Sequence, residues 1–145
     1  MARTLEMKYK LEFSAPIRGH HIYKDNWWPK IGEELNCQKD NREDAIQYDK
    51  FSIGVFKNEE LVGHIPSEIS ELLTHFIQNS PKNKMIAFPI GKRKREIGLV
   101  VPAKYMAICE NKKVAQILME KLLEKQKILD IRVQNALKCV PIFTK

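Results

Sequence analysis

The sequence predicts a small, mainly β domain in which short strands form a barrel and two helices pack against it. Three observations favour this α+β class. Alternating apolar and polar residues, typical of half-buried strands, recur in several short stretches. Two longer segments have instead the apolar spacing of three and four residues that an amphipathic helix shows. The chain has 145 residues, of which 43% are hydrophobic, and this suffices for one core.

The first part of the chain is expected to form strands joined by polar loops. Residues 7–14 alternate between apolar and polar side chains, which predicts a half-buried strand. Residues 17–24 are expected to form a second strand, broken or bulged at Gly19, because glycine interrupts a ladder. A short strand is expected at 35–38, and the charged stretch 39–47 is predicted to be a surface loop.

A hairpin and the first helix follow. Residues 51–56 and 61–65 are expected to pair through the four-residue connection KNEE. After Pro66 the apolar residues recur at three and four positions, which predicts an amphipathic helix over 67–78. Ser67 is a natural N-cap at the start of this helix, because its hydroxyl can accept from a free backbone N–H.

Strands return in the last third of the chain, before a second helix. KMIAFPIG (84–91) and KREIGLVV (94–101) are expected to be strands on either side of a basic turn. AKYMAICE (103–110) is expected to be one more strand. Asn111 is expected to begin the second helix, and the pattern leaves open how far this helix continues beyond residue 126.

Charge and cysteine content limit the classes of partner and compartment. The net charge of +7 favours an anionic partner, either nucleic acid or an acidic membrane surface, although a basic balance can also serve solubility alone. The three cysteines are odd in number and far apart, unlike a disulfide framework. No stretch has the apolar length of a secretory signal or a membrane helix. We expect an intracellular, reducing compartment and no membrane partner.

Known catalytic and metal-binding motifs do not occur in the sequence. It has no P-loop, dinucleotide-binding glycine pattern, zinc-protease motif or nucleophile elbow, so we expect no enzyme and no cofactor. His20, His21 and Cys37 are potential zinc ligands. Adjacent histidines on a strand point to opposite faces, however, so we expect no metal site. Asp40 and Asp44 lie in an acidic segment without the turn glycine of an EF-hand, and a solvated loop is expected there.

Two local features suit nucleic acid. Four consecutive cations follow the strand at 84–91: Lys92, Arg93, Lys94 and Arg95. This run is compatible with a nuclear import signal, a phosphate-contacting turn or a solvated hairpin tip. Trp27 and Trp28 are adjacent, so one is expected to enter the core while the other stays exposed as a stacking surface. Exposed rings beside cations are typical of sites that bind single-stranded nucleic acid.

His64 is a further candidate. It follows Gly63 at the end of a predicted strand and directly precedes a helix N-terminus, where free backbone N–H groups attract anions. The alternative is a structural histidine that donates to a nearby carbonyl group.

The hairpin and its flanks resemble the HIRAN domain family, best known at the front of a helicase-like transcription factor. In that family Tyr-Asp precedes the first strand, and Val-Gly-His and a branched aliphatic residue end the second, just before a helix. The matching residues here are Tyr48, Asp49, Ile53, Val55, Val62, Gly63, His64 and Ile65. VPAKYMAICENKKVAQIL is similar to the family's closing strand and last helix. The resemblance covers Phe13 to Lys125, and its opening part is similar to standalone invertebrate members.

The resemblance implies a fold and a site. The fold would be a small OB-like β-barrel with two helices, and the studied members bind single-stranded DNA at its 3′-hydroxyl end. Tyr48 would stack on the terminal base, Asp49 would accept from the 3′-hydroxyl, and His64 would donate to a phosphate. The family's basic–aromatic pair on the opening strand falls near His21, Tyr23 and Lys24.

We therefore expect a non-enzymatic nucleic-acid-binding module of nuclear location. Residues 1–126 would form the HIRAN-like barrel domain, and 127–145 a helical C-terminal extension. The alternative is a protein-interaction adaptor that keeps the fold and has lost the DNA pocket. In the first case Tyr23, Tyr48 and His64 should converge with Asp49 in one open groove.

Overall fold

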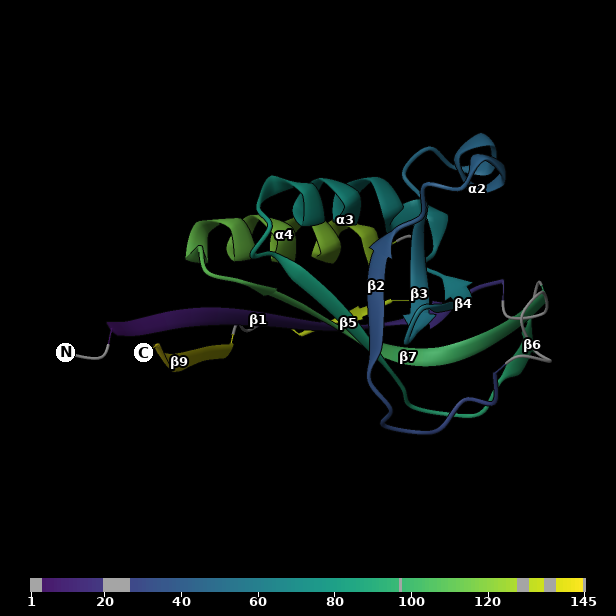
Figure 1. Cartoon of the computed structure of the whole chain (residues 1–145), viewed down its shortest axis with the longest axis horizontal. Coiled ribbons are helices and arrows are strands. Elements are labelled where there is room, and N and C mark those ends of the chain that lie inside the picture. Colours follow the sequence, from purple (N-terminus) through teal and green to yellow (C-terminus); the bar gives the residue numbers. More distant parts are fainter. Residues whose placement is uncertain (1–3, 20–26, 97, 128–130, 135–137, 145) are drawn as a thin grey trace.

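The computed structural model places an antiparallel sheet beside a layer of helices (Figure 1). It describes residues 4–19, 27–96, 98–127, 131–134 and 138–144. The strands in this part of the chain are β1 (Thr4–Ile17), β2 (Leu35–Lys39), β3 (Ile53–Lys57), β4 (Glu60–His64), β5 (Lys84–Pro89), β6 (Lys94–Glu96), β7 (Gly98–Cys109), β8 (Arg132–Val133) and β9 (Lys138–Thr144). The helices are α2 (Glu43–Tyr48), α3 (Ser67–Asn79) and α4 (Lys112–Lys125). The predicted class, mainly β with packed helices, is confirmed.

The sheet is strongly curved but is not a closed barrel. Its strand order is β4-β3-β2-β5-β7-β1-β8, with β6 paired to β7 and β9 paired to β1. At one point its edge strand meets β1 again, because Arg18 and His64 form an isolated antiparallel bridge. Each backbone N–H of this pair donates to the other's carbonyl at 2.8 Å. This bridge brings the end of β1 against the end of β4.

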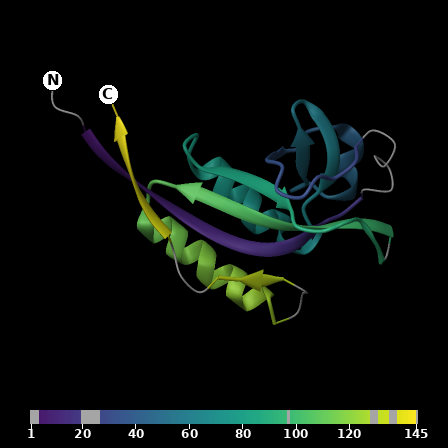
Figure 2. The ribbon, with the colours of Figure 1, turned by 90° about the horizontal axis from the view of Figure 1, so that it is seen from below.

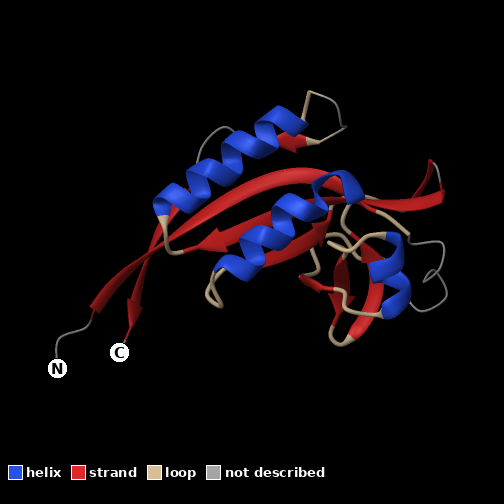
Figure 3. Cartoon of the chain, turned by 90° about the horizontal axis from the view of Figure 1, so that it is seen from above, coloured by secondary structure: helices blue, strands red, loops and turns tan. Residues whose placement is uncertain are grey.

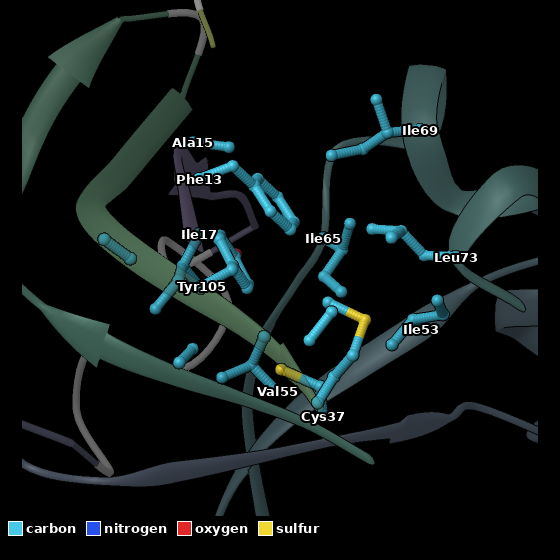
Figure 4. Packing of buried hydrophobic residues seen from close by; sticks show 14 of the residues in the cluster. Phe13, Ala15, Ile17, Cys37, Ile53, Val55, Ile65, Ile69, Leu73 and Tyr105 are labelled. Atoms are coloured by element: carbon cyan, nitrogen blue, oxygen red, sulfur yellow. The ribbon is translucent and has the colours of Figure 1, made fainter. Parts of the chain in front are cut away.

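The core lies between the curved sheet and the two longer helices. Figure 3 shows α3 and α4 side by side along one face of the sheet. Phe13 of β1 and Tyr105 of β7 are fully buried and stack with ring centroids 5.2 Å apart. In Figure 4 these rings share one cluster with Ile69 and Leu73 of α3. Burial of this apolar surface holds α3 on the sheet, so the end of β4 is held as well.

Most predicted elements are confirmed with small changes of bounds. Strands occupy the predicted segments 7–14, 35–38, 51–56, 61–65 and 84–91, and helices occupy 67–78 and 112–125. Asn111 is the N-cap of α4 as predicted, and its Oδ1 accepts from the Val114 N–H at 3.2 Å. Of the predicted strand 17–24, Ile17 ends β1 and Gly19 has a φ of +76°. Residues 20–24 lie outside the described residues.

The loop predicted at 39–47 is wrong, because α2 occupies most of it. Ala45 is the only buried residue of this six-residue helix, so the sequence has no apolar periodicity from which to detect it. Glu43 and Asp44 lie in its first turn, where negative charge is favourable beside the free N–H groups.

Two further predictions of local structure are wrong. The hairpin between β3 and β4 turns through two residues rather than four, because Lys57 already pairs with Glu60. Asn58 takes a φ of 56° in this turn, a conformation that asparagine tolerates. At the start of α3 the N-cap is Pro66 rather than Ser67, and the Ser67 hydroxyl donates to Glu68 Oε1 at 3.0 Å.

The predicted strand 94–101 is in fact two strands. β6 folds back on the first residues of β7, and β7 then runs on without a break through Pro102. The sequence pattern predicts separate strands at 94–101 and 103–110, on either side of Pro102, although proline lacks only an N–H for the ladder. In the structure Pro102 lies opposite Pro16 of β1, so the two residues without a donor share one position of the ladder.

The described part of the chain after α4 contains two strands, β8 and β9, and no helix. α4 ends at Lys125, and β8 and β9 both pair with β1, so the predicted helical form of the extension is wrong. Lys138 of β9 donates to the buried Glu12 of β1 at 2.9 Å. Figure 2 shows β9 and the first half of β1 running away from the body together, with both termini at the same end.

The domain boundary at residue 126 stays a prediction. Among the described helices, none has both the length and the apolar character needed to cross a bilayer.

Gly63 permits the close approach of β4 to β1. A Cβ at this position would lie 2.4 Å from Ile17 Cγ2 and 2.9 Å from the Arg18 carbonyl oxygen. Because one of these neighbours is backbone, relief of the contact requires the two strands to separate.

We therefore expect Gly63→Ala to lower the free energy of unfolding by about 3 kcal/mol, the upper end of the usual cost of overpacking. Chemical denaturation measures this loss. Gly32→Ala is the control, because its Cβ would meet nothing within 4 Å. Its φ of +85° should cost only about 1 kcal/mol. An equal loss in the two variants would contradict the role of Gly63 in strand closure.

Candidate functional site

Tyr48 presents an aromatic ring to solvent at the end of α2. It is the last residue of the helix, and its side chain is 90% exposed. Asp49 follows as the C-cap, and its N–H donates to the Ala45 carbonyl at 2.8 Å. The backbone that carries the ring is therefore fixed while the ring itself is open to a ligand.

The carboxylate of Asp49 links this corner to α3. Its Oδ1 accepts from the Phe51 N–H at 2.9 Å, and its Oδ2 accepts from the Ser70 hydroxyl at 2.6 Å. The first contact is the turn-capping bond that aspartate commonly makes. Each carboxylate oxygen has a second lone pair, so the half-buried group retains capacity for another donor.

His64 faces a buried acid that the sequence analysis assigned to a solvated loop. His64 Nε2 lies 2.7 Å from Asp40 Oδ2, and Asp40 is only 2% exposed. The Arg42 guanidinium donates to both carboxylate oxygens, and the Arg42 N–H donates to Oδ1 at 3.1 Å. Burial alone would raise the pKa of Asp40. The hydrogen bonds from Arg42 and His64 outweigh burial and hold this pKa at about 2.

A second ion pair lies beside the bridge between β1 and β4. The Arg18 guanidinium pairs with the Glu68 carboxylate, and this contact holds the pKa of Glu68 below its ordinary value. Arg18 and Arg42 are thus each matched by a carboxylate. The surface around His64 is a set of paired charges rather than a bare basic patch.

The two acids, Asp40 and Asp49, are joined through Ser52, which directly precedes β3. The Asp40 N–H donates to the Ser52 carbonyl at 2.9 Å, and the Ser52 N–H donates to the Asp49 carbonyl at 3.0 Å. Asp49, Asp40 and His64 therefore lie at the same end of the sheet, next to Tyr48. Tyr23 and Lys24, which were expected at the same groove, lie outside the described residues.

The basic run lies at a different place. Lys92 and Lys94 are exposed, and the Arg93 guanidinium carbon lies 3.9 Å from the centroid of the Trp28 ring. Arg95 belongs to β6, where its backbone pairs with Leu99. Trp28 is 73% exposed whereas Trp27 is 2% exposed, so the predicted division of the two rings is confirmed.

A groove between α3 and α4 is a second concave surface. Its volume is about 560 Å³, and its apolar lining includes Leu72, Phe76 and Ile117. Glu68 and Glu71 line it from α3, and Lys121, Glu124 and Lys125 line it from α4. Sequence analysis missed this groove, because Ile117 reads as one more core position of an amphipathic helix.

The described residues offer little for metal or thiol chemistry. They contain no cluster of three histidine, cysteine or acidic side chains arranged to hold a metal ion. Cys37, Cys109 and Cys139 are free. Burial raises the pKa of the Cys37 and Cys109 thiols, which disfavours the reactive thiolate form.

Comparisons with known proteins identify the fold. No protein-family model matches the chain, and the curated proteins contain no match. Among solved structures, the chain is similar to the HIRAN domain of human HLTF, with a TM-score of 0.60 and 18% identity. The alignment covers 80% of this chain and 91% of that chain. The chain therefore has the HIRAN-domain fold, as the resemblance of the hairpin predicted.

The pairing of Asp40 predicts a specific loss of stability in acid. An aspartate whose pKa is about 2 when folded and 3.8 ordinarily stabilises the fold fully above about pH 4. This contribution, about 2 kcal/mol, is lost as the pH falls from about 4 to about 2. Denaturant titrations at several pH values measure the free energy of unfolding. Between about pH 4 and about pH 2, this free energy should fall less for Asp40→Asn than for the wild type. The exposed Asp44 gives the matched control, and Asp44→Asn should keep the wild-type profile. An unchanged acid profile in Asp40→Asn would contradict the assignment.

Proposed function

We propose that this chain is a non-enzymatic nucleic-acid-binding module that holds single-stranded DNA at the corner formed by Tyr48, Asp49 and His64. The observation that carries the proposal is the 90% exposure of Tyr48 on a rigid helix end. A base stacked on such a ring contributes about 1–3 kcal/mol. The HIRAN-domain fold supports the proposal. In this chain Tyr48 ends α2, Asp49 caps that helix just before β3, and His64 ends β4.

The charge of the chain supports an anionic ligand. The net charge of +7 would increase the rate of encounter with DNA, and a nuclear location would fit such a partner. The paired state of Arg18 and Arg42 means that local phosphate contacts would be few. Base stacking would therefore supply more of the affinity here than ion pairing.

Recognition of a 3′-hydroxyl is the finer part of the proposal, and it rests on Asp49. Contacts from Phe51 and Ser70 fix the orientation of the carboxylate, and a second lone pair on each oxygen can accept from a hydroxyl. A carboxylate repels phosphate, so its place beside a DNA strand suits the one position where the strand ends in a hydroxyl. Asp40 would orient the His64 ring for contact with the adjoining phosphate.

The second candidate is a protein-interaction adaptor, and the groove between α3 and α4 favours it. The groove combines apolar side chains with two acids from α3 and with two lysines and one glutamate from α4. Such a surface suits an amphipathic helix better than DNA. On this account Asp49 serves only as a turn cap, and replacement of Tyr48 does not change the affinity for any nucleic acid.

End recognition can be tested with two oligonucleotides that differ only in a 3′-hydroxyl or a 3′-phosphate. We expect the wild type to bind the phosphate form at least about tenfold more weakly, because one charge-assisted hydrogen bond is lost. Asp49→Asn should weaken binding to the hydroxyl form. It should also narrow the difference in affinity between the two forms, since the repulsion between the carboxylate and the 3′-phosphate is removed. Asp44→Asn, on the same helix, should behave as the wild type. Equal affinity of the wild type for both ends would exclude end recognition by this chain.

Stacking can be tested separately with Tyr48→Ala. We expect affinity for both oligonucleotides to fall by about tenfold, because the ring contributes equally to either end. Ile46→Ala removes another exposed apolar side chain of α2 and is the matched control. Fluorescence anisotropy of a labelled strand measures the affinity of both variants. If the two variants bind alike, Tyr48 does not stack on DNA and the adaptor becomes the better account.

A further inference from the structure

Trp28 is a second exposed aromatic ring, and the structure holds it in place. The ring is 73% exposed, and the Arg93 guanidinium packs on its face. A guanidinium on a tryptophan face stabilises the pair by roughly 0.5–1 kcal/mol at an exposed site and restricts the ring. The ring is thus ordered without being buried.

The loop that carries the ring is fixed by one carboxylate. Glu33 accepts from Lys30 N–H at 2.6 Å and from Trp27 Nε1 at 3.4 Å. Its Oε1 also lies 3.2 Å from Lys57 Nζ at the end of β3. These contacts tie the loop to the β3–β4 hairpin, and the buried Trp27 ring anchors it in the core.

Trp28 also lines a hollow beside the hairpin. The hollow has a volume of about 670 Å³, and Lys30 and Lys57 lie on its wall together with Trp28. Arg93 contacts the ring but does not line the hollow, so part of the ring stays open to it. Glu59 and Glu60 line the hollow as well, which confines a phosphate to the side of the two lysines.

We propose that Trp28, held by Arg93, is a second stacking position that takes an unpaired DNA base in this hollow, with an adjoining phosphate at Lys30. This inference rests on the proposed function and extends it to a second site. An ordered exposed ring beside cations and a hollow is the arrangement that a single-stranded base needs.

The two stacking positions lie at opposite ends of one strand. Asp49 contacts Phe51 just before β3 begins, whereas the Trp28 loop contacts Lys57 at the end of β3. Five strand residues span roughly 17 Å at about 3.3 Å each. One DNA strand could therefore contact both rings, and the second contact would raise affinity only for strands long enough to reach it.

The test uses intrinsic fluorescence, because a stacked base changes the emission of an exposed tryptophan. The full chain is titrated with oligo-dT of about 12 and about 3 nucleotides, a range that brackets the shorter sites of OB folds. We expect saturable quenching with the longer strand. Trp28→Ala should lower the affinity for the longer strand by about tenfold and leave the affinity for the shorter strand, held at Tyr48, unchanged. The affinities of the variants are measured by fluorescence anisotropy of a labelled strand.

Two further variants serve as controls. Ile31→Ala removes another exposed apolar side chain from the same loop, 70% exposed, and should bind like the wild type. Trp28→Phe keeps an aromatic face, so it should retain most of the affinity while it loses the fluorescence change. Thermal unfolding of each variant checks that the fold is intact.

The outcomes separate this inference from the proposed function. Suppose that Tyr48→Ala lowers the affinity for DNA, but that Trp28→Ala does not and no quenching occurs. The second stacking position is then wrong and the proposed function stands. If quenching occurs and Tyr48→Ala has no effect, the Trp28 position is supported and the Tyr48 site is wrong. If no oligonucleotide binds at either length, both are wrong.

Discussion

The bridge between Arg18 and His64 is the contact on which the rest of the candidate site depends. It joins two strands that are distant in the strand order, and Gly63 makes it possible because any side chain there would meet β1. Once β4 is held against β1, α3 must start at this corner and bury Ile69 and Leu73 over the sheet. The positions of His64 and of the helix that contacts Asp49 follow from one pair of backbone hydrogen bonds.

Two acids near this corner have different physical roles. Asp40 is buried, and it is stabilised as a carboxylate because Arg42 and His64 donate to it. Asp49 is half-buried and accepts one donor on each oxygen. A fully enclosed carboxylate such as Asp40 serves the fold, since any ligand would have to displace its partners. Each oxygen of Asp49 keeps a second lone pair, so its capping role would be compatible with recognition of a ligand.

Sequence patterns predicted those features that depend on residues close together along the chain. The alternation of β1, the apolar spacing of α3 and the capping residue Asn111 are local, and the structure confirms them. The pair Asp40 and His64 is 24 residues apart, and it was missed because nothing local marks a charged residue in an acidic stretch as buried. α2 was missed for the converse reason, since a helix that buries only one residue has no periodicity. Periodicity predicted only single elements, whereas the resemblance of the hairpin to the HIRAN family predicted the whole fold.

The distribution of charge decides what kind of binding this surface can support. Arg18, Arg42 and Lys57 are each engaged by a carboxylate, so a phosphate would have to compete with an existing partner at each. Such exchange yields little net free energy, because the contact formed replaces one of similar strength. The exposed Tyr48 ring, and the part of the Trp28 ring that Arg93 leaves open, face no such competition, since a base there displaces only water. Among the described residues, the exposed rings of Tyr48 and Trp28 are therefore the side chains from which a nucleic acid would gain most. Their separation along β3 would favour an extended single strand over a compact ligand.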